Sequence, residues 1–153
     1  MNISALISAI LLIEVGVIVC IKLLNMGKVS KLWYKEFGIV AVLCDVCSLL
    51  IGILLANMLF PNSLLLGSVI VQVCHDILFY LFVIRPLPKG TNSMIDMMKT
   101  YASQESYTTI IGDSVMMANT VLLYYVLKNQ SIDLIVLCGT LGLYAITYLL
   151  HTN

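Results

Sequence analysis

Four acidic side chains lie within stretches that are otherwise apolar enough to cross a lipid bilayer. They are Glu14, Asp45, Asp76 and Asp113, and His75 directly precedes Asp76. An ionisable group inside a bilayer costs roughly 2.5 kcal/mol or more, so such groups usually have a task or a buried partner. We therefore interpret these five residues as the candidate functional site.

This set of side chains is compatible with three kinds of chemistry. Carboxylate and imidazole groups are ordinary metal ligands, so the set could bind a divalent cation, which is the one cofactor we consider. A desolvated carboxylate crowded by other acids can also hold a proton near neutrality, so the set could carry protons or a monovalent cation. In the third interpretation the protonated acids and His75 only hydrogen-bond between helices. All three stay open at the level of sequence.

The composition requires a membrane. Of the 153 residues, 61% are hydrophobic and 10% are charged, and the mean hydropathy is +1.04, so the chain cannot cover itself with a water-facing surface. Five stretches are each close to the roughly 20 residues that cross the hydrocarbon. They are residues 3–24, 38–60, 63–84, 107–127 and 132–150. We predict an all-α, polytopic transmembrane helical bundle of five spans, formed by residues 1–153 as a single domain.

The basic residues predict how the bundle is oriented. Seven of the eight lie in or beside the loops at 25–37 and 85–106, which the positive-inside rule assigns to the cytoplasmic side. The N-terminus is then outside and the C-terminus cytoplasmic. Trp33 and Tyr34, near one helix end, fit an interfacial aromatic belt. The seven basic residues are Lys22, Lys28, Lys31, Lys35, Arg85, Lys89 and Lys99.

The sequence also predicts which partners the protein has. The lipid bilayer is the first, and a second copy of the chain is the other that we consider. A basic face with interleaved aromatic residues is missing from the sequence, so we expect no nucleic-acid partner.

Depth estimates place the acids in one layer. At about 1.5 Å of rise per residue, Glu14 lies ~15 Å from the cytoplasmic end of its helix, Asp45 ~10 Å, Asp76 ~12 Å and Asp113 ~9 Å. His75 joins the same layer. We expect Asp45, His75, Asp76 and Asp113 to form one site, with Glu14 at its edge because it lies deepest.

The loop at 85–106 has internal order. Pro86, Pro88 and Gly90 cannot continue the third span, and Ser93 with Asp96 resembles an acidic capping box that starts a short helix. A methionine face on that helix suits the membrane interface, but the interpretation that we favour is a surface connector. That face comprises Met94, Met97, Met98 and Tyr101.

The basic start of this loop could bind lipid. Arg85, Lys89 and Asn92 are placed to contact a lipid phosphate, for which the arginine side chain is well shaped. The alternative is that these residues only anchor the topology.

One cysteine pair requires separate consideration. Cys44 and Cys47 form a C-x-x-C motif, which can be a redox dithiol. All five cysteines lie in apolar segments, and the loops carry none that could act as a relay. Because isolated apolar cysteines usually pack as small hydrophobic residues, we predict no redox site.

The middle of the chain carries a resemblance. The sequence is HDILFY at 75–80, IRPLPKG at 84–90, MID at 94–96 and GDS at 112–114. Over residues 72–117 it resembles small multi-pass membrane proteins encoded by large DNA viruses of eukaryotes. The resemblance implies a host-derived membrane or the internal membrane of a virion as the location, and it implies no role for any individual residue.

Together these observations favour an integral membrane protein that handles cations or protons in a transport or channel-like role. The first alternative is a metal-dependent membrane enzyme that acts on lipid, with the loop at 85–106 holding the head group. The second alternative is a structural component of a virion or cell membrane. A transporter needs a water path from both sides, an enzyme needs an opening to one leaflet or to the cytoplasm, and a structural component needs neither. Whether the protein is an enzyme stays open.

The predicted orientation can be tested by labelling. Lys31→Cys and Ser131→Cys, introduced singly, should react with an impermeant thiol reagent from opposite sides of the membrane, with Lys31→Cys on the cytoplasmic side. The unsubstituted chain is the control for labelling of its own cysteines. Reaction of both variants from one side would contradict the five-span topology.

Overall fold

The structure is a computed structural model that describes residues 1–24, 27–105 and 107–152. Within these ranges it is helical, without strands. The long helices are α1 (Ile3–Leu23), α3 (Ile39–Leu59), α4 (Leu64–Phe79) with its continuation as the π-helix η1 (Tyr80–Ile84), α6 (Tyr107–Leu127) and α7 (Ile132–His151). The short helices are α2 (Lys28–Phe37) and α5 (Ser93–Gln104).

The five predicted spans are confirmed. Five helices are long and apolar enough to cross a membrane, when α4 and η1 are taken as one span, and their ends agree with the sequence prediction to within one residue. Many large apolar side chains point outward from them, among them Leu43, Ile51, Phe82, Val136 and Leu141. An outer surface of this kind is stable against lipid and not against water, so the protein is an integral membrane protein.

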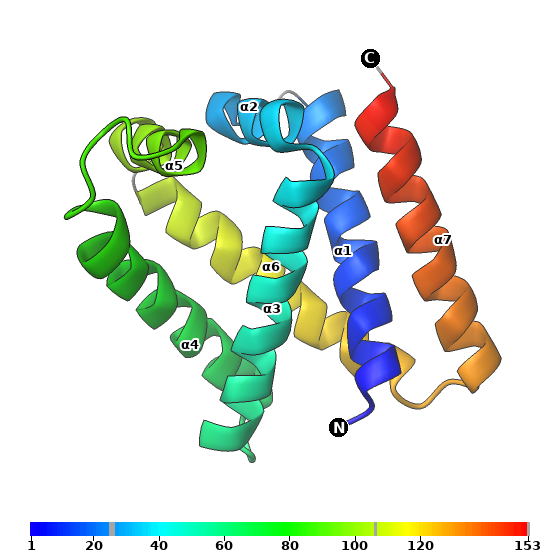
Figure 1. Cartoon of the computed structure of the whole chain (residues 1–153). Coiled ribbons are helices and arrows are strands. Elements are labelled where there is room, and N and C mark those ends of the chain that lie inside the picture. The colour runs from blue at the N-terminus through cyan, green and yellow to red at the C-terminus, as the bar shows by residue number, and fades with distance from the viewer. Residues whose placement is uncertain (25–26, 106, 153) are drawn as a thin grey trace.

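The helices form a bundle with two distinct ends (Figure 1). The helix α1 lies near the middle and packs against α7, α6 and α3, while α4 packs against α6 and α3. The short helices α2 and α5 lie at the end of the bundle where the chain terminates, and the N-terminus lies at the opposite end. The two basic loops of the sequence analysis are therefore on one side of the bundle.

Small residues allow α1 and α7 to approach each other closely. A Cβ atom on Gly139 would lie 2.6 Å from Ser8 Oγ, and one on Gly142 would lie 3.1 Å from Leu11 Cβ. The Ser8 hydroxyl donates a hydrogen bond of 2.8 Å to the Ile135 carbonyl, which ties the two helices together. Small residues and hydroxyl groups are the usual means of packing helices in lipid, where the hydrophobic effect between spans is weak.

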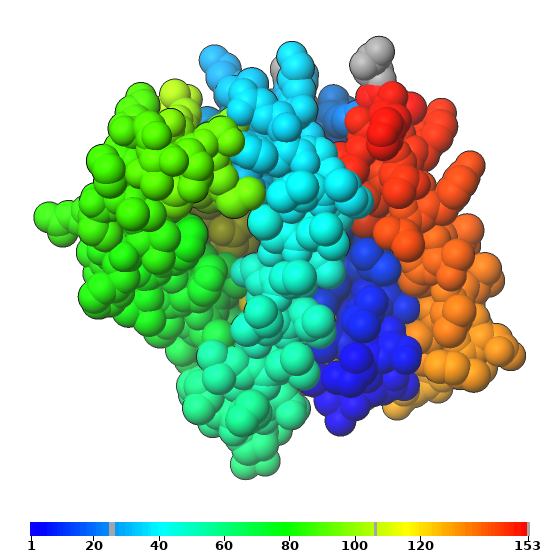
Figure 2. Space-filling model, viewed as in Figure 1, coloured from blue at the N-terminus to red at the C-terminus, as the bar shows by residue number. Residues whose placement is uncertain are grey.

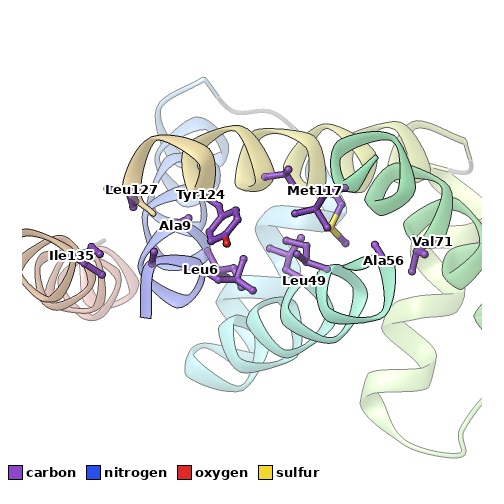
Figure 3. Close-up of a cluster of buried hydrophobic side chains, with 14 residues drawn as sticks. Leu6, Ala9, Leu49, Ala56, Val71, Met117, Tyr124, Leu127 and Ile135 are labelled. Carbon is purple, nitrogen blue, oxygen red and sulfur yellow. The ribbon is translucent and has the colours of Figure 1, made fainter. Parts of the chain in front are cut away.

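Two apolar clusters fill the interior. Figure 3 shows the first, which joins α1, α3, α4, α6 and α7 through residues such as Leu6, Leu49, Met117 and Ile135. The second joins α1, α2, α3, α5 and α7, and its buried members are Ile18, Ile21, Val29, Trp33, Tyr34, Ala41, Val42, Met97 and Ile146.

The helix α2 was not predicted. The apolar side chains Val29 and Trp33 lie one turn apart and both are buried, so this short segment gains its stability from packing against the bundle. Gly38 has a φ of +51°, a value that side chains disfavour, and it lets the chain turn from α2 into α3. Trp33 and Tyr34 are only 4% and 8% exposed, so they face the protein interior rather than a lipid interface.

The predicted helix in the third loop is confirmed as α5, but its cap is different. The Asn92 side chain accepts the Ile95 N–H at 2.8 Å and is the N-cap, one residue before the predicted Ser93. Asp96 accepts the Gly90 N–H at 2.8 Å, so it closes the preceding turn instead of completing a capping box with Ser93. Both side chains fix the angle at which the loop enters α5.

The methionine face of α5 packs against the bundle. Met97 is buried in the second cluster, and Met94, Met98 and Tyr101 are partly exposed and pack against that cluster. The face therefore attaches α5 to the bundle, which fits a surface connector, and contact of these side chains with the lipid interface stays a prediction.

The contact between α1 and α7 gives a prediction about stability. Gly142→Leu should destabilise the protein by about 1–3 kcal/mol, because the added side chain meets Leu11 on α1. Gly16→Leu is the matched control, since a Cβ atom there meets nothing within 4 Å. Thermal unfolding in detergent should separate the two variants, and equal unfolding temperatures would contradict close packing of α1 on α7.

Candidate functional site

The centre of the candidate site is a tyrosine that contacts two acids. The Tyr34 hydroxyl oxygen lies 2.7 Å from Glu14 Oε1 and 2.9 Å from Asp45 Oδ2. Trp33 adds a longer contact, its indole N–H pointing to Asp45 Oδ2 at 3.3 Å. The site thus joins α1, α2 and α3, and we call Glu14, Tyr34 and Asp45 the tyrosine–acid triad.

The folding of α1 explains why Glu14 is buried. Ile10 and Ile18 lie one turn before and one turn after it, and both face the interior. Glu14 occupies the same stripe and has no exposed surface. Its second oxygen, Oε2, is buried without a hydrogen-bond partner in the described part of the chain. A carboxylate in this position is costly unless its charge is neutralised.

The number of protons in the triad is constrained. A phenol has a single proton, so Tyr34 can donate to only one of the two carboxyl groups. Burial, followed by the nearby charges of Asp45 and Glu14, raises the pKa of the Tyr34 phenol above its ordinary value, so the phenol keeps its proton. For both short contacts to be hydrogen bonds, one acid must be protonated and donate to the Tyr34 oxygen.

A second group of polar side chains lies on α4. Asp76 Oδ1 accepts the Gln72 amide at 2.8 Å and lies 3.1 Å from His75 Nδ1. The other oxygen, Asp76 Oδ2, is buried and has no partner among the described residues. The His75 side chain is 52% exposed and stacks on Phe79, with ring centroids 5.8 Å apart. His75 therefore connects a buried acid with the outer surface of α4.

The remaining acid, Asp113, lies half-buried on α6. Figure 2 shows a hollow between α3 and the segment formed by α4 and α5, and atoms of α6 lie at its floor. The helix α6 packs against both α4 and α3, so the acids of these three helices belong to neighbouring elements.

The structure rearranges the predicted site. Glu14, which was expected at the edge of the site, is a member of the triad through its contact with Tyr34. Among the described residues, no single hydrogen-bonded cluster contains all four of the side chains Asp45, His75, Asp76 and Asp113. Nor does any group of three or more His, Cys, Asp or Glu side chains within those ranges have an arrangement suited to a metal ion.

Sequence reasoning missed Tyr34 and Trp33 as members of the site. The sequence predicts a loop around them, which places both residues in an interfacial belt. The apolar residues Val29, Trp33 and Phe37 recur every fourth position, which is the signal that predicts an amphipathic helix. Such a helix, lying at the end of a bundle, places its aromatic face over the spans.

The cysteine pair and the predicted lipid-binding residues lie outside the triad. Cys44 and Cys47 are free thiols on α3, the first half-buried and the second exposed, and their structural role stays a prediction. Arg85 and Lys89 are exposed beyond the end of the third span, whereas the Asn92 oxygen is engaged as the cap of α5.

Comparisons with protein-family models, with curated proteins and with solved structures gave no match for this chain. The geometry of the site is therefore the basis for the functional argument.

The role of the phenol in the triad can be tested by stability. Tyr34→Phe keeps the ring but removes the hydroxyl that contacts both acids, so we expect a loss of about 1–3 kcal/mol in unfolding free energy. Tyr148→Phe is the control, because that side chain is exposed on α7. Thermal unfolding in detergent would measure the difference, and equal stability of the two variants would show that the phenol contacts contribute nothing.

Proposed function

We propose that the protein handles protons within its membrane and that the tyrosine–acid triad holds a shared proton. The observation that carries the proposal is the position of the Tyr34 oxygen, 2.7 Å and 2.9 Å from two carboxyl oxygens, with Glu14 fully buried. For both contacts of the Tyr34 oxygen to be hydrogen bonds, the triad needs one proton in addition to that of the phenol. Glu14 is the acid that we assign as the proton carrier, because it has no exposed surface and its second oxygen has no hydrogen-bond partner among the described residues.

The donor set favours a proton over a metal ion. Hard divalent cations prefer six or more oxygen ligands or a compact set of carboxylates, whereas the triad offers two carboxyl groups that both contact a phenol. A proton needs only one donor and one acceptor at hydrogen-bond distance, which the triad provides twice.

The remaining acids support a route toward the surface of the bundle. Asp45 belongs to the triad on α3, and Asp113 lies on α6, which packs against both α3 and α4, the helix of Asp76. Asp76 in turn contacts the exposed His75. We propose that protons pass between the triad and His75 through this series, with water in the hollow of Figure 2 bridging the gaps between side chains.

A structural role is the second candidate, and one observation favours it. The triad joins α1, α2 and α3, so its hydrogen bonds could serve only to hold these helices together. The metal-dependent enzyme that acts on lipid has weaker support, since it requires a ligand set that the acids do not form among the described residues. Measurements of proton flux and stability on the same variants separate the two leading candidates.

The location and orientation are also proposals. We propose that the end of the bundle that carries α2 and α5 faces the cytoplasm, because their loops contain most of the basic residues. The resemblance of residues 72–117 to virus-encoded proteins supports a host-derived or virion membrane. Self-association in that membrane stays a prediction.

The proposal is tested in proteoliposomes with an imposed pH gradient. The purified full chain should conduct protons, and Glu14→Gln and Asp45→Asn should each reduce the flux at least tenfold, because an amide cannot release a proton. Asp113→Asn and Asp76→Asn should reduce it as well. Asp133→Asn is the control, since Asp133 is exposed in the first turn of α7.

Infrared spectroscopy supplies an independent readout. The unsubstituted protein should show the carbonyl band of a protonated carboxyl group near neutral pH, and Glu14→Gln should remove that band. Wild-type flux in both triad variants would contradict proton handling at this site. Absent flux in the unsubstituted protein, together with loss of stability in the variants, would leave the structural role.

A further inference from the structure

A groove of about 300 Å³ lies between η1 and α5, where the third span reaches the surface of the membrane. Its lining is formed by Tyr80, Ile84, Arg85, Lys99, Ala102 and Ser103. The lining thus contains two cations and two hydroxyl groups and no acid. This combination of donors fits an anion.

The π-helix η1 shapes one wall of the groove. The Arg85 N–H bonds to the Tyr80 carbonyl at 2.8 Å, five residues back, so this last turn of the span is wider than an α-helical turn. The Lys99 ammonium donates to the Ile84 carbonyl at 2.6 Å. This bond holds one cation beside the groove, and an ammonium group has two further N–H bonds to offer.

The positive charge of the groove is not neutralised by protein. Within the described ranges neither Arg85 nor Lys99 makes an ion pair. The two acids of α5 and its cap are engaged elsewhere, since Asp96 accepts the Gly90 N–H and Glu105 accepts the Val29 N–H at 3.0 Å. A ligand anion would therefore supply the missing charge.

We infer that this groove binds the phosphate of an anionic phospholipid head group. The guanidinium of Arg85 and the ammonium of Lys99 are the charged donors for the phosphate oxygens, and Ser103 adds a hydroxyl. We assign the phosphate to a lipid because the groove lies at the end of a span whose neighbouring side chains are apolar and point outward. Phe82 is 73% exposed and Leu81 is 41% exposed, which gives an acyl chain a surface to follow.

This site differs from the lipid contact that the sequence predicted. Arg85 belongs to both, but Lys89 and Asn92 do not line the groove, and Lys99 and Ser103 replace them. The bend of the loop brings α5 back onto η1, which is why residues so far apart in sequence share the groove. The site does not depend on the proposed proton handling.

The experiment uses the purified full chain in neutral detergent, depleted of lipid and titrated with phosphatidylglycerol, phosphatidylcholine or inorganic phosphate. Binding is followed by thermal stability and by native mass spectrometry. Phosphatidylglycerol should bind and stabilise the protein, and Arg85→Gln combined with Lys99→Gln should weaken that binding about tenfold or more, as expected for loss of charge-assisted hydrogen bonds.

Two further variants keep the test independent of folding. Arg85→Gln alone removes a side chain that makes no hydrogen bond in the described structure, and it should still weaken binding of phosphatidylglycerol. Lys35→Gln is the matched control, because Lys35 is an exposed lysine on α2 at the same end of the bundle and should have no effect. Equal binding of phosphatidylcholine, or unchanged affinity in the double variant, would overturn the inference. Saturation by inorganic phosphate at the same concentrations would show a site for free anions instead of lipid.

Discussion

The structure depends on one phenol that contacts two carboxyl groups, one of which is fully shielded from water. In water, each acid would ionise independently and Tyr34 would have little influence on either. In the bundle, Glu14 has no exposed surface, and the Tyr34 oxygen is the nearest hydrogen-bonding partner of both acids. The protonation states of three residues on three helices are therefore linked, since a change at one alters what the other two can donate or accept.

This linkage explains why a chain with so few charges keeps acids in its most apolar segments. Asp76 is similar, since one of its oxygens is bonded to Gln72 and contacts His75, and the other is buried without a partner in the part of the chain that the structure describes. Groups of this kind are costly in a bundle, so they are usually kept for a function or for bonds that hold helices together. Both consequences follow from the same geometry, which is why flux and stability must be measured together.

The spans could be predicted from sequence because each depends only on local composition over about 20 residues. The start of α5 was predicted to within a residue, since Asn92, Ser93 and Asp96 all offer side chains that favour a helix start. The triad could not be predicted, because it depends on where α2 lies. Nothing local to Glu14 or Asp45 indicates a tyrosine on a separate short helix that ends at Gly38. Lys99 was missed for a similar reason, as only the return of α5 onto η1 brings it near Arg85.

The location of Tyr34 has a consequence for how such a site could open. Two members of the triad belong to membrane spans, but the third belongs to α2, a helix of 10 residues that lies across the end of the bundle and meets α3 at Gly38. A small rotation of α2 about that glycine would withdraw the phenol and leave Glu14 and Asp45 in place. The moving element would then be the short helix α2 instead of a membrane span, and its motion would displace little lipid. Tyr34 therefore links the position of α2 to the contacts of Glu14 and Asp45.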